Sequence, residues 1–235
     1  MWDNAPLLRS IANALLGFSV CAMLYGVVYY VTHLPGLFTL HSVRLMAAPQ
    51  RVDTAEVLEV VRNEVRGNFF TVDIKQLRQS LEKLPWVRNV NIRREFPSRL
   101  EVQLEEHKAL AHWNNSALVN RQGEVFDAQS AQVLPVFMGP DGDAAEVTQY
   151  YAQFERQLAG LNLQVEKIVL TPRHAWQLHL SNGMVLELGR EDMQQRLERF
   201  VKVYPYSLAV VQHRVKYVDL RYRNGFAVGG LAKQG

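Results

Sequence analysis

Residues 84–106 read LPWVRNVNIRREFPSRLEVQLEE, and this stretch decides how the first half of the chain folds. Pro85 ends a helical pattern, because proline lacks the backbone N–H and clashes with the preceding turn. From Val90 onward apolar and polar side chains alternate, which is the period of a strand. Phe96-Pro97 then marks a turn, after which the alternation resumes. The stretch therefore predicts an antiparallel hairpin with one apolar face.

Two helices and a further strand are expected on the N-terminal side of this hairpin. Residues 40–46 read as a short strand. Asp53, with Glu56 three residues later, is typical of a capping box, and valines follow at helical spacing. A stripe of leucines predicts a second helix over residues 73–84. The order strand, helix, helix, strand, strand over residues 40–107 predicts a compact α+β domain in which both helices cover one face of the sheet.

An apolar segment precedes this domain. Residues 11–31 carry no charged side chain, and about 20 such residues cross the hydrocarbon core of a bilayer. A cleaved signal peptide is disfavoured, since its apolar region is usually only about 7–15 residues long. Pro35-Gly36 ends the helical pattern. We expect an uncleaved transmembrane helix over residues 11–34, with residues 1–10 as a cytoplasmic head.

The second half of the chain, residues 108–230, predicts another α+β domain with an antiparallel sheet. Asn182-Gly183 separates two alternating arms, as in a tight hairpin. Residues 144–159 and 191–204 carry apolar side chains at helical spacing. Strands are expected over residues 109–113, 117–119, 125–126, 165–170, 176–180 and 184–188. Residues 231–235 are expected to form a tail.

Composition argues against nucleic acid as a partner. The chain has 26 basic and 23 acidic residues, for a net charge of +3. Proteins that bind nucleic acid usually concentrate positive charge on one face. The near balance of basic and acidic residues in this chain does not predict such a face. The single cysteine, Cys21, lies in the apolar segment, so no intrachain disulfide can form.

Motifs for catalysis, metal binding and nucleotide binding are missing from the sequence. It contains no GxSxG, HExxH, GxxxxGK[ST] or GxGxxG pattern. His107 and His112, like His174 and His179, are an odd number of residues apart, which on a strand places the two imidazoles on opposite faces. We expect solvated histidines, no metal, no cofactor and no enzyme activity.

The stretch from residue 84 to residue 113 resembles the FtsQ/DivIB family of bacterial cell-division proteins, at the POTRA domain and its exit. Leu84-Pro85-Trp86-Val87 and Phe96-Pro97-x-x-Leu100 have the family spacing, although Phe96 stands where many members have Trp and Lys108 where many have Pro. Later blocks of the chain agree with the family: Val133-Leu134-Pro135, Gly139-Pro140-Asp141-Gly142, Trp176-Gln177-Leu178, Leu188-Gly189-Arg190 and Tyr217-Val218-Asp219-Leu220-Arg221-Tyr222.

The resemblance implies a single-pass protein of the cell inner membrane, with a cytoplasmic N-terminus and its bulk in the periplasm at the division septum. Members of the family are non-catalytic scaffolds that link early and late proteins of the division machinery. They bind the FtsB–FtsL pair through the second domain, whereas the POTRA domain is associated with recruitment and with other division proteins.

The end of the chain, residues 217–228, is the expected docking edge for FtsB. Val218, Leu220 and Tyr222 are expected on one apolar face of a strand, and the edge is expected to continue through a bend at Asn224-Gly225 rather than to fold back as a hairpin arm. A plain structural strand is the alternative. Phe226 is bulkier, and Gly230 smaller, than the residue that some relatives carry. The expected contact residues are Tyr217, Asp219, Arg221, Tyr222, Asn224, Gly225, Phe226, Ala227 and Val228.

The hairpin of the first domain carries a possible recruitment surface. It consists of Trp86, Arg88, Arg93 and Arg94, with Arg99 beside them. The alternative is an ordinary solvated sheet face with one buried tryptophan.

Two other functions compete with the scaffold. POTRA-type domains also occur in transport and assembly modules of the envelope, which usually carry tandem repeats and a C-terminal β-barrel, and the sequence shows no pattern for either. A membrane-anchored cell-wall enzyme would need a nucleophile or a metal site. Depletion distinguishes the three, since filamentous cells are expected for a scaffold, outer-membrane defects for transport, and lysis with altered muropeptides for an enzyme.

Overall fold

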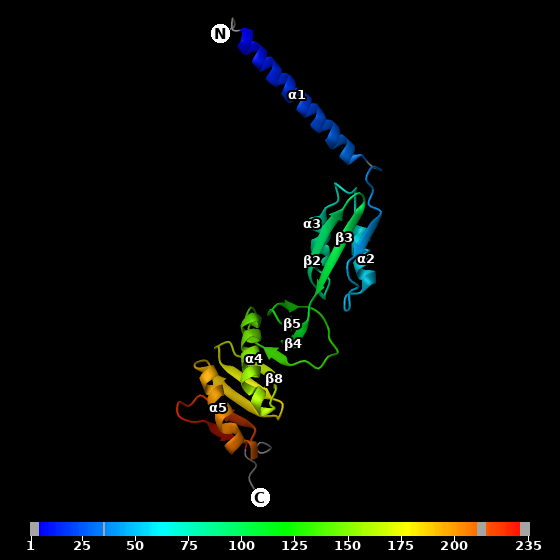
Figure 1. Cartoon of the computed structure of the whole chain (residues 1–235). Helices are drawn as coiled ribbons and strands as arrows, with labels where there is room; N and C mark the ends of the chain where they lie inside the picture. The colour runs from blue at the N-terminus through cyan, green and yellow to red at the C-terminus, as the bar shows by residue number, and fades with distance from the viewer. Residues whose placement is uncertain (1–4, 35, 211–214, 231–235) are drawn as a thin grey trace. The chain divides into compact units, whose positions relative to one another are not determined.

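A computed structural model describes residues 5–34, 36–210 and 215–230. The chain divides into two compact units, Met1–Glu106 and the part that begins at His107. Figure 1 shows the helix and the sheet of the first unit and the larger sheet of the second. The units are described one at a time.

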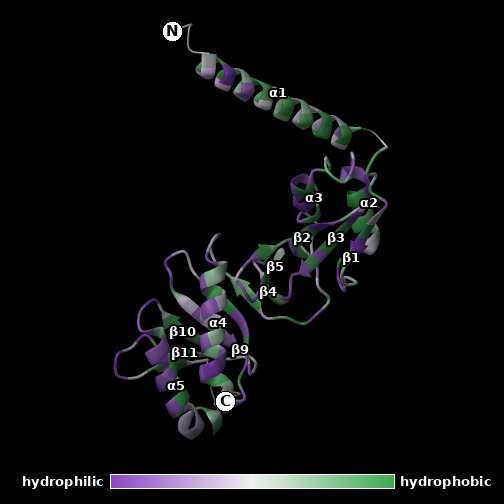
Figure 2. Ribbon diagram, turned by 45° about the horizontal axis from the view of Figure 1, so that its top comes forward, coloured by the Kyte–Doolittle hydropathy of each residue, from purple (hydrophilic) through white to green (hydrophobic). Residues whose placement is uncertain are grey.

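Helix α1 (Ala5–His33) is a single continuous helix that is long and apolar enough to cross a membrane. None of its apolar stretch is buried against protein. Figure 2 shows mainly apolar residues along most of its length. An exposed helix of this composition is stable where hydrocarbon replaces water, because its backbone groups are all paired within the helix. The helix therefore fits a transmembrane segment.

The first unit has the predicted order of elements, and the α+β class is confirmed. It contains β1 (Ser42–Leu45), α2 (Thr54–Glu64), α3 (Ile74–Leu81), β2 (Val87–Glu95) and β3 (Arg99–Glu106). The sheet order is β1-β3-β2, with β1 parallel and β2 antiparallel to β3. Asp53 caps α2 by accepting from the Ala55 N–H at 2.8 Å, as its position in the sequence predicts.

The core of this unit lies between the helices and one face of the sheet. Leu77 and Leu81 of α3 are fully buried against Leu100 and Val102 of β3. At the far end of β3, the Glu106 carboxylate accepts from the backbone N–H groups of residues 50, 51 and 52 at 2.8 to 3.1 Å. These hydrogen bonds hold the segment between β1 and α2 against the end of the sheet.

The second unit is built on a nine-stranded sheet with the order β12-β11-β10-β9-β8-β7-β4-β5-β6. Helices α4 (Ala144–Leu158) and α5 (Met193–Ser207) lie side by side and share one apolar core with the sheet (Figures 1 and 2). A short 3-10 turn, Ala159–Leu161, follows α4. The strands are β4 (Ala109–Trp113), β5 (Ala117–Asn120), β6 (Val125–Phe126), β7 (Val136–Met138), β8 (Val165–Leu170), β9 (Trp176–Leu180), β10 (Val185–Gly189), β11 (Tyr217–Asp219) and β12 (Ala227–Gly229).

The sheet is mixed. Helix α4 connects β7 to β8 and α5 connects β10 to β11, and both pairs are parallel. The helix returns the chain to the end of the sheet at which the preceding strand began, so the next strand runs in the same direction. The hairpin at Asn182-Gly183 is confirmed, with Gly183 at φ +79° and β9 antiparallel to β10.

The interpretation of the chain end as a single continuing edge is wrong. Strand β12 folds back and pairs antiparallel with β11, joining Tyr217 to Gly229 and Asp219 to Ala227. The Asp219 side chain accepts from the Arg221 N–H at 3.0 Å, and such a local bond competes with the strand ladder. The strand therefore ends at Asp219, and Tyr222 lies in the loop with 58% of its surface exposed rather than on an apolar strand face.

The expectation that the histidines are all solvated is also wrong. His107 is buried, its ring stacked on Phe126 with ring centroids 4.1 Å apart. Its Nδ1 lies 3.0 Å from the amide nitrogen of the fully buried Asn120. The apolar partner of His107 comes from β6, which an alternation pattern around residue 107 does not reveal.

Candidate partner-binding edge

Strand β12 stands at one end of the nine-stranded sheet, and β11 pairs only one of its sides. The Gly229 carbonyl oxygen accepts from the Lys216 N–H at 3.0 Å and so faces β11. Because peptide groups alternate in direction along a strand, the N–H and the carbonyl group of Val228 point to the outer side. No described strand pairs with the outer side of β12, which therefore offers one donor and one acceptor at Val228.

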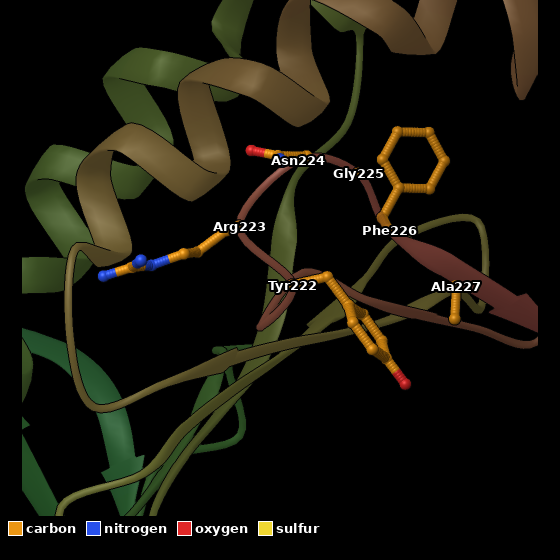
Figure 3. A pocket seen from close by; sticks show the side chains of 6 residues that line it. All are labelled: Tyr222, Arg223, Asn224, Gly225, Phe226 and Ala227. Carbon is orange, nitrogen blue, oxygen red and sulfur yellow. The ribbon is translucent and has the colours of Figure 1, made fainter.

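The loop before β12 forms an open pocket of about 470 Å³, lined by residues 222–227. Figure 3 shows the Tyr222 ring and the Ala227 side chain on one side of this segment and the Phe226 ring on the other. Phe226 and Val228 pack partly against the core, whereas Tyr222 is largely exposed. The structure thus brings together the expected contact residues Tyr222, Asn224, Gly225, Phe226, Ala227 and Val228.

Arg199 of α5 holds this loop in place, and it is a residue that the sequence analysis missed. Its Nη1 donates to the carbonyl oxygens of Tyr222 at 2.8 Å and Arg223 at 2.6 Å, and reaches that of Gly225 at 3.5 Å. A guanidinium presents several donors in a fixed plane, which suits a cluster of carbonyl groups. No motif signals such a contact, because the partners are backbone atoms more than 20 residues away in the chain.

Asp219 and Arg221 bind each other. The Arg221 Nε and Nη2 donate to the two carboxylate oxygens at 2.8 and 2.6 Å. The hydrogen bonds from the Arg221 side chain lower the pKa of Asp219, although burial alone would raise it. The same pairing raises the pKa of Arg221. Arg221, one of the expected contact residues, therefore already has an acidic partner within the chain, although most of its side chain is exposed.

Two glycines fix the geometry at the end of the sheet. A Cβ on Gly229 would come within 2.1 Å of the Tyr217 ring, so the ring lies directly over this glycine. Gly230 has φ +83°, and a Cβ there would come within 2.5 Å of the Lys216 Cβ. Glycine adopts this left-handed backbone without steric cost. Glycine, which is smaller than the residue of some relatives, is therefore the residue that suits the backbone conformation at position 230.

A basic pocket of about 360 Å³ lies next to this hairpin. Arg196 donates to the Leu188 carbonyl oxygen at 2.7 Å, and Arg190 lies 3.3 Å from Glu191. Arginine is well suited to bidentate binding of carboxylates. The pocket is lined by Arg173, Ala175, Gly189, Arg190, Glu191, Arg196 and Arg221.

The expected recruitment residues of the first unit lie at two ends of β2. Arg88 pairs with Glu105 at 2.6 Å, and the Arg51 guanidinium stacks over the Trp86 ring at 4.5 Å. Arg93 and Arg94 lie at the other end of the strand, about 20 Å away at 3.3 Å per residue. Arg94 donates to the Val72 carbonyl oxygen at 2.9 Å. The four side chains do not form one patch.

Within the described ranges, no three His, Cys, Asp or Glu side chains gather closely enough to hold a metal ion. In the part of the chain that the structure describes, one helix apolar enough to cross a membrane precedes a small β-α-α-β-β unit and a large sheet that ends in the edge strand β12, and this combination fits a membrane-anchored interaction protein. Residues 38–107 match the family model described as the FtsQ-type POTRA domain, and residues 111–221 match that of the C-terminal region of cell division protein FtsQ/DivIB.

Curated relatives agree over the full length. The chain is 42% identical to the cell division protein FtsQ of Nitrosospira multiformis, over 98% of this chain and 99% of the relative. It is 37% identical to the proteins of the same name from Bordetella pertussis, over 97% and 92%, and Burkholderia pseudomallei, over 97% and 94%. The chain belongs to the FtsQ/DivIB family of cell-division proteins, a family of non-catalytic scaffolds. Membership implies a role in the division machinery through protein–protein interactions.

Proposed function

We propose that the chain is a scaffold of the inner membrane that links early and late division proteins by binding the FtsB–FtsL pair through the outer edge of β12. Helix α1 anchors it and residues 1–10 lie in the cytoplasm, whereas the two folded domains, residues 40–107 and 108–230, lie in the periplasm at the septum. The POTRA unit, residues 40–107, contacts other division proteins, and the second domain, residues 108–230, carries the FtsB edge.

The observation that carries this proposal is the outward-facing peptide group of Val228 at the end of the sheet. An extended partner segment placed beside β12 gains main-chain hydrogen bonds there, and adjacent side-chain pockets supply specificity. The pocket of residues 222–227 lies at the start of the same strand. A partner strand on this edge has an apolar site for a side chain within reach.

Charge supports an acidic partner. The basic pocket contains four arginines and one glutamate, and Arg221 belongs both to it and to the loop that leads to Tyr222. Asp219 neutralises part of this charge, because its carboxylate binds Arg221. The remaining positive charge favours a partner segment with carboxylates spaced along an extended strand, and it accelerates the encounter at low salt.

The test removes the outward-facing N–H. Val228→Pro deletes this donor and places the proline ring where the carbonyl group of an incoming strand would lie, so it is expected to abolish binding of purified FtsB–FtsL periplasmic segments in a pull-down. Val228→Thr is the matched control, because it keeps the shape of the β-branched side chain and the backbone N–H, and is expected to bind. Thermal unfolding followed by circular dichroism establishes that both variants are folded. Binding by folded Val228→Pro at the wild-type level would exclude strand addition at this edge.

A further inference from the structure

The end of the POTRA unit that follows α1 exposes a group of large apolar side chains. Leu37 and Phe38 are 45% and 37% exposed, Phe70 is 44% exposed and Phe96 is 72% exposed. They come from three separate segments: the exit from α1, the loop between α2 and α3, and the turn between β2 and β3. We call Leu37, Phe38, Phe70 and Phe96 the aromatic tip.

The aromatic tip is held together by specific contacts. Phe38 and Phe70 meet edge to face with ring centroids 5.0 Å apart, and the buried Phe69 contacts both Phe70 and Phe96 at 5.2 and 6.0 Å. The Phe69 N–H donates to the Phe38 carbonyl oxygen at 2.9 Å. These contacts fix three segments relative to one another, so the exposed rings form one surface rather than scattered apolar residues.

The covalent chain keeps this surface close to the membrane. Residues 11–31 span the hydrocarbon core of about 30 Å, which places His33, the last residue of α1, in the headgroup layer. Phe38 follows five residues later and so lies within about 18 Å of the helix end at full extension. The Asn68 side chain also donates to the Thr32 carbonyl oxygen at 2.7 Å. The α2–α3 loop is therefore tied to the last turn of the anchor.

Four arginines occur in the segments that carry the aromatic tip, and one of them, Arg94, contacts its backbone. Arg66 precedes the α2–α3 loop, and Arg93, Arg94 and Arg99 flank the β2–β3 turn, against the acidic Asp73 and Glu95. Arg94 donates to the carbonyl oxygens of Val72 at 2.9 Å and Phe70 at 3.5 Å, so its charge stays beside the rings. Exposed aromatic side chains with a basic rim are the pattern of protein surfaces that bind the membrane interface.

We propose that the aromatic tip is inserted in the headgroup layer of the membrane that α1 spans, with the arginines of these segments near lipid phosphates. The POTRA unit is then held against the bilayer by two attachments, the helix and the rings. This proposal rests on α1 crossing a membrane and does not depend on the partner proposed for β12.

The experiment uses the full chain, alone, in lipid nanodiscs. Cys21→Ser removes the single thiol, and Ser98→Cys beside Phe96 then carries an environment-sensitive fluorophore. Ala48→Cys, in the segment that Glu106 closes onto the opposite end of the sheet, is the matched control. We expect a blue-shifted emission and strong quenching by headgroup nitroxide lipids at position 98 but not at position 48. The effect at position 98 should be larger with phosphatidylglycerol than with phosphatidylcholine alone.

Phe96→Ser in the Ser98→Cys background tests the ring itself. This side chain is mostly exposed, so the fold is expected to survive, and the quenching at position 98 should fall toward that of the control. Equal quenching at both positions, unchanged quenching in Phe96→Ser, or a response only after other division proteins are added would overturn the proposal. Binding of FtsB–FtsL by these variants is a separate readout, which distinguishes failure here from failure at β12.

Discussion

The guanidinium of Arg199 and the carbonyl oxygen of Tyr222 lie 2.8 Å apart, and the same nitrogen contacts the carbonyl oxygen of Arg223 at 2.6 Å. A charged donor on α5 thus determines where the loop before β12 sits. Tyr222 has a largely exposed side chain, so its position depends on its backbone rather than on packing. The candidate site is therefore positioned by a residue outside it.

Arg199→Ala is expected to weaken FtsB–FtsL binding without unfolding the protein. Losing hydrogen bonds from a charged donor costs about 1.5–3 kcal/mol at most, and this contact is partly exposed, so we expect about a 5- to 10-fold weaker Kd. Arg199→Lys keeps the charge and a nitrogen donor, although without the planar guanidinium, and should recover part of the affinity. Biolayer interferometry measures both. A wild-type Kd for Arg199→Ala would mean that the loop holds its own shape.

A charge at Tyr222 is expected to abolish partner binding. Exposed tyrosines at interface centres often contribute 2 kcal/mol or more, and Tyr222→Glu removes the ring and adds a charge that must be desolvated. Tyr222→Phe keeps the ring and is the control. In a pull-down, Tyr222→Glu should fail and Tyr222→Phe should succeed. Retained binding by Tyr222→Glu would place the partner elsewhere on the protein.

Gly230→Ala is expected to destabilise the end of the sheet by about 1–2 kcal/mol, because an L residue is strained at φ +83° and its Cβ would meet Lys216. Gly225→Ala is the matched control: no atom lies within 4 Å of the added Cβ and its φ is ordinary. Chemical denaturation measures the free energy of unfolding of each variant. Equal values for the two variants would contradict the assigned backbone at residue 230.

The stability of the first unit should depend on the ionisation of Glu106. Burial raises the pKa of this carboxyl, but three backbone N–H donors more than offset it, so its pKa in the folded protein lies below the ordinary value of 4.5. A depressed pKa means that the contribution to stability is complete above about pH 4.5 and is lost as the pH falls through the folded pKa.

Glu106→Gln removes the titrating group while keeping an acceptor. The free energy of unfolding of the wild type, measured from pH 7 to pH 3, should fall more steeply below pH 4.5 than that of the variant. At pH 7 the variant is expected to lose about 1 kcal/mol, since neutral acceptors form weaker bonds than carboxylates. Parallel curves for the two proteins would show that the carboxylate has no such role.

Local signals predicted much of the fold. Asp53 caps α2 and Asn182-Gly183 turns the chain, and both depend only on neighbouring residues. Strand β7 was missed because it is three residues long and pairs with β4 and β8, whose positions its own residues do not encode. Asn224-Gly225 was expected to mark a bend in a continuing edge, but a loop held by Arg199 reverses the chain there, and β12 pairs back with β11.

In the candidate site, too, the residue types could be predicted from the sequence, whereas the features set by strand pairing could not. Tyr222 and Phe226 could be named from the sequence because their residue types and spacing resemble a family motif. The direction in which the edge runs could not be, because it follows from the pairing of β11 with β12. Asp219 and Arg221 form an ion pair. Strand alternation predicts that residues two apart lie on the same face of a strand, but it does not predict that their side chains bind each other.

The short length of β12 limits self-association of the protein through this edge. A strand from a second copy of the chain that pairs with this edge forms only the two hydrogen bonds of Val228, each contributing about 1 kcal/mol net. Association costs at least about 4 kcal/mol in lost freedom, so such a pairing dissociates at once. We therefore expect copies of the chain not to stack edge to edge, and we expect the proposed partner strand to need the neighbouring pockets as well as Val228 to stay bound.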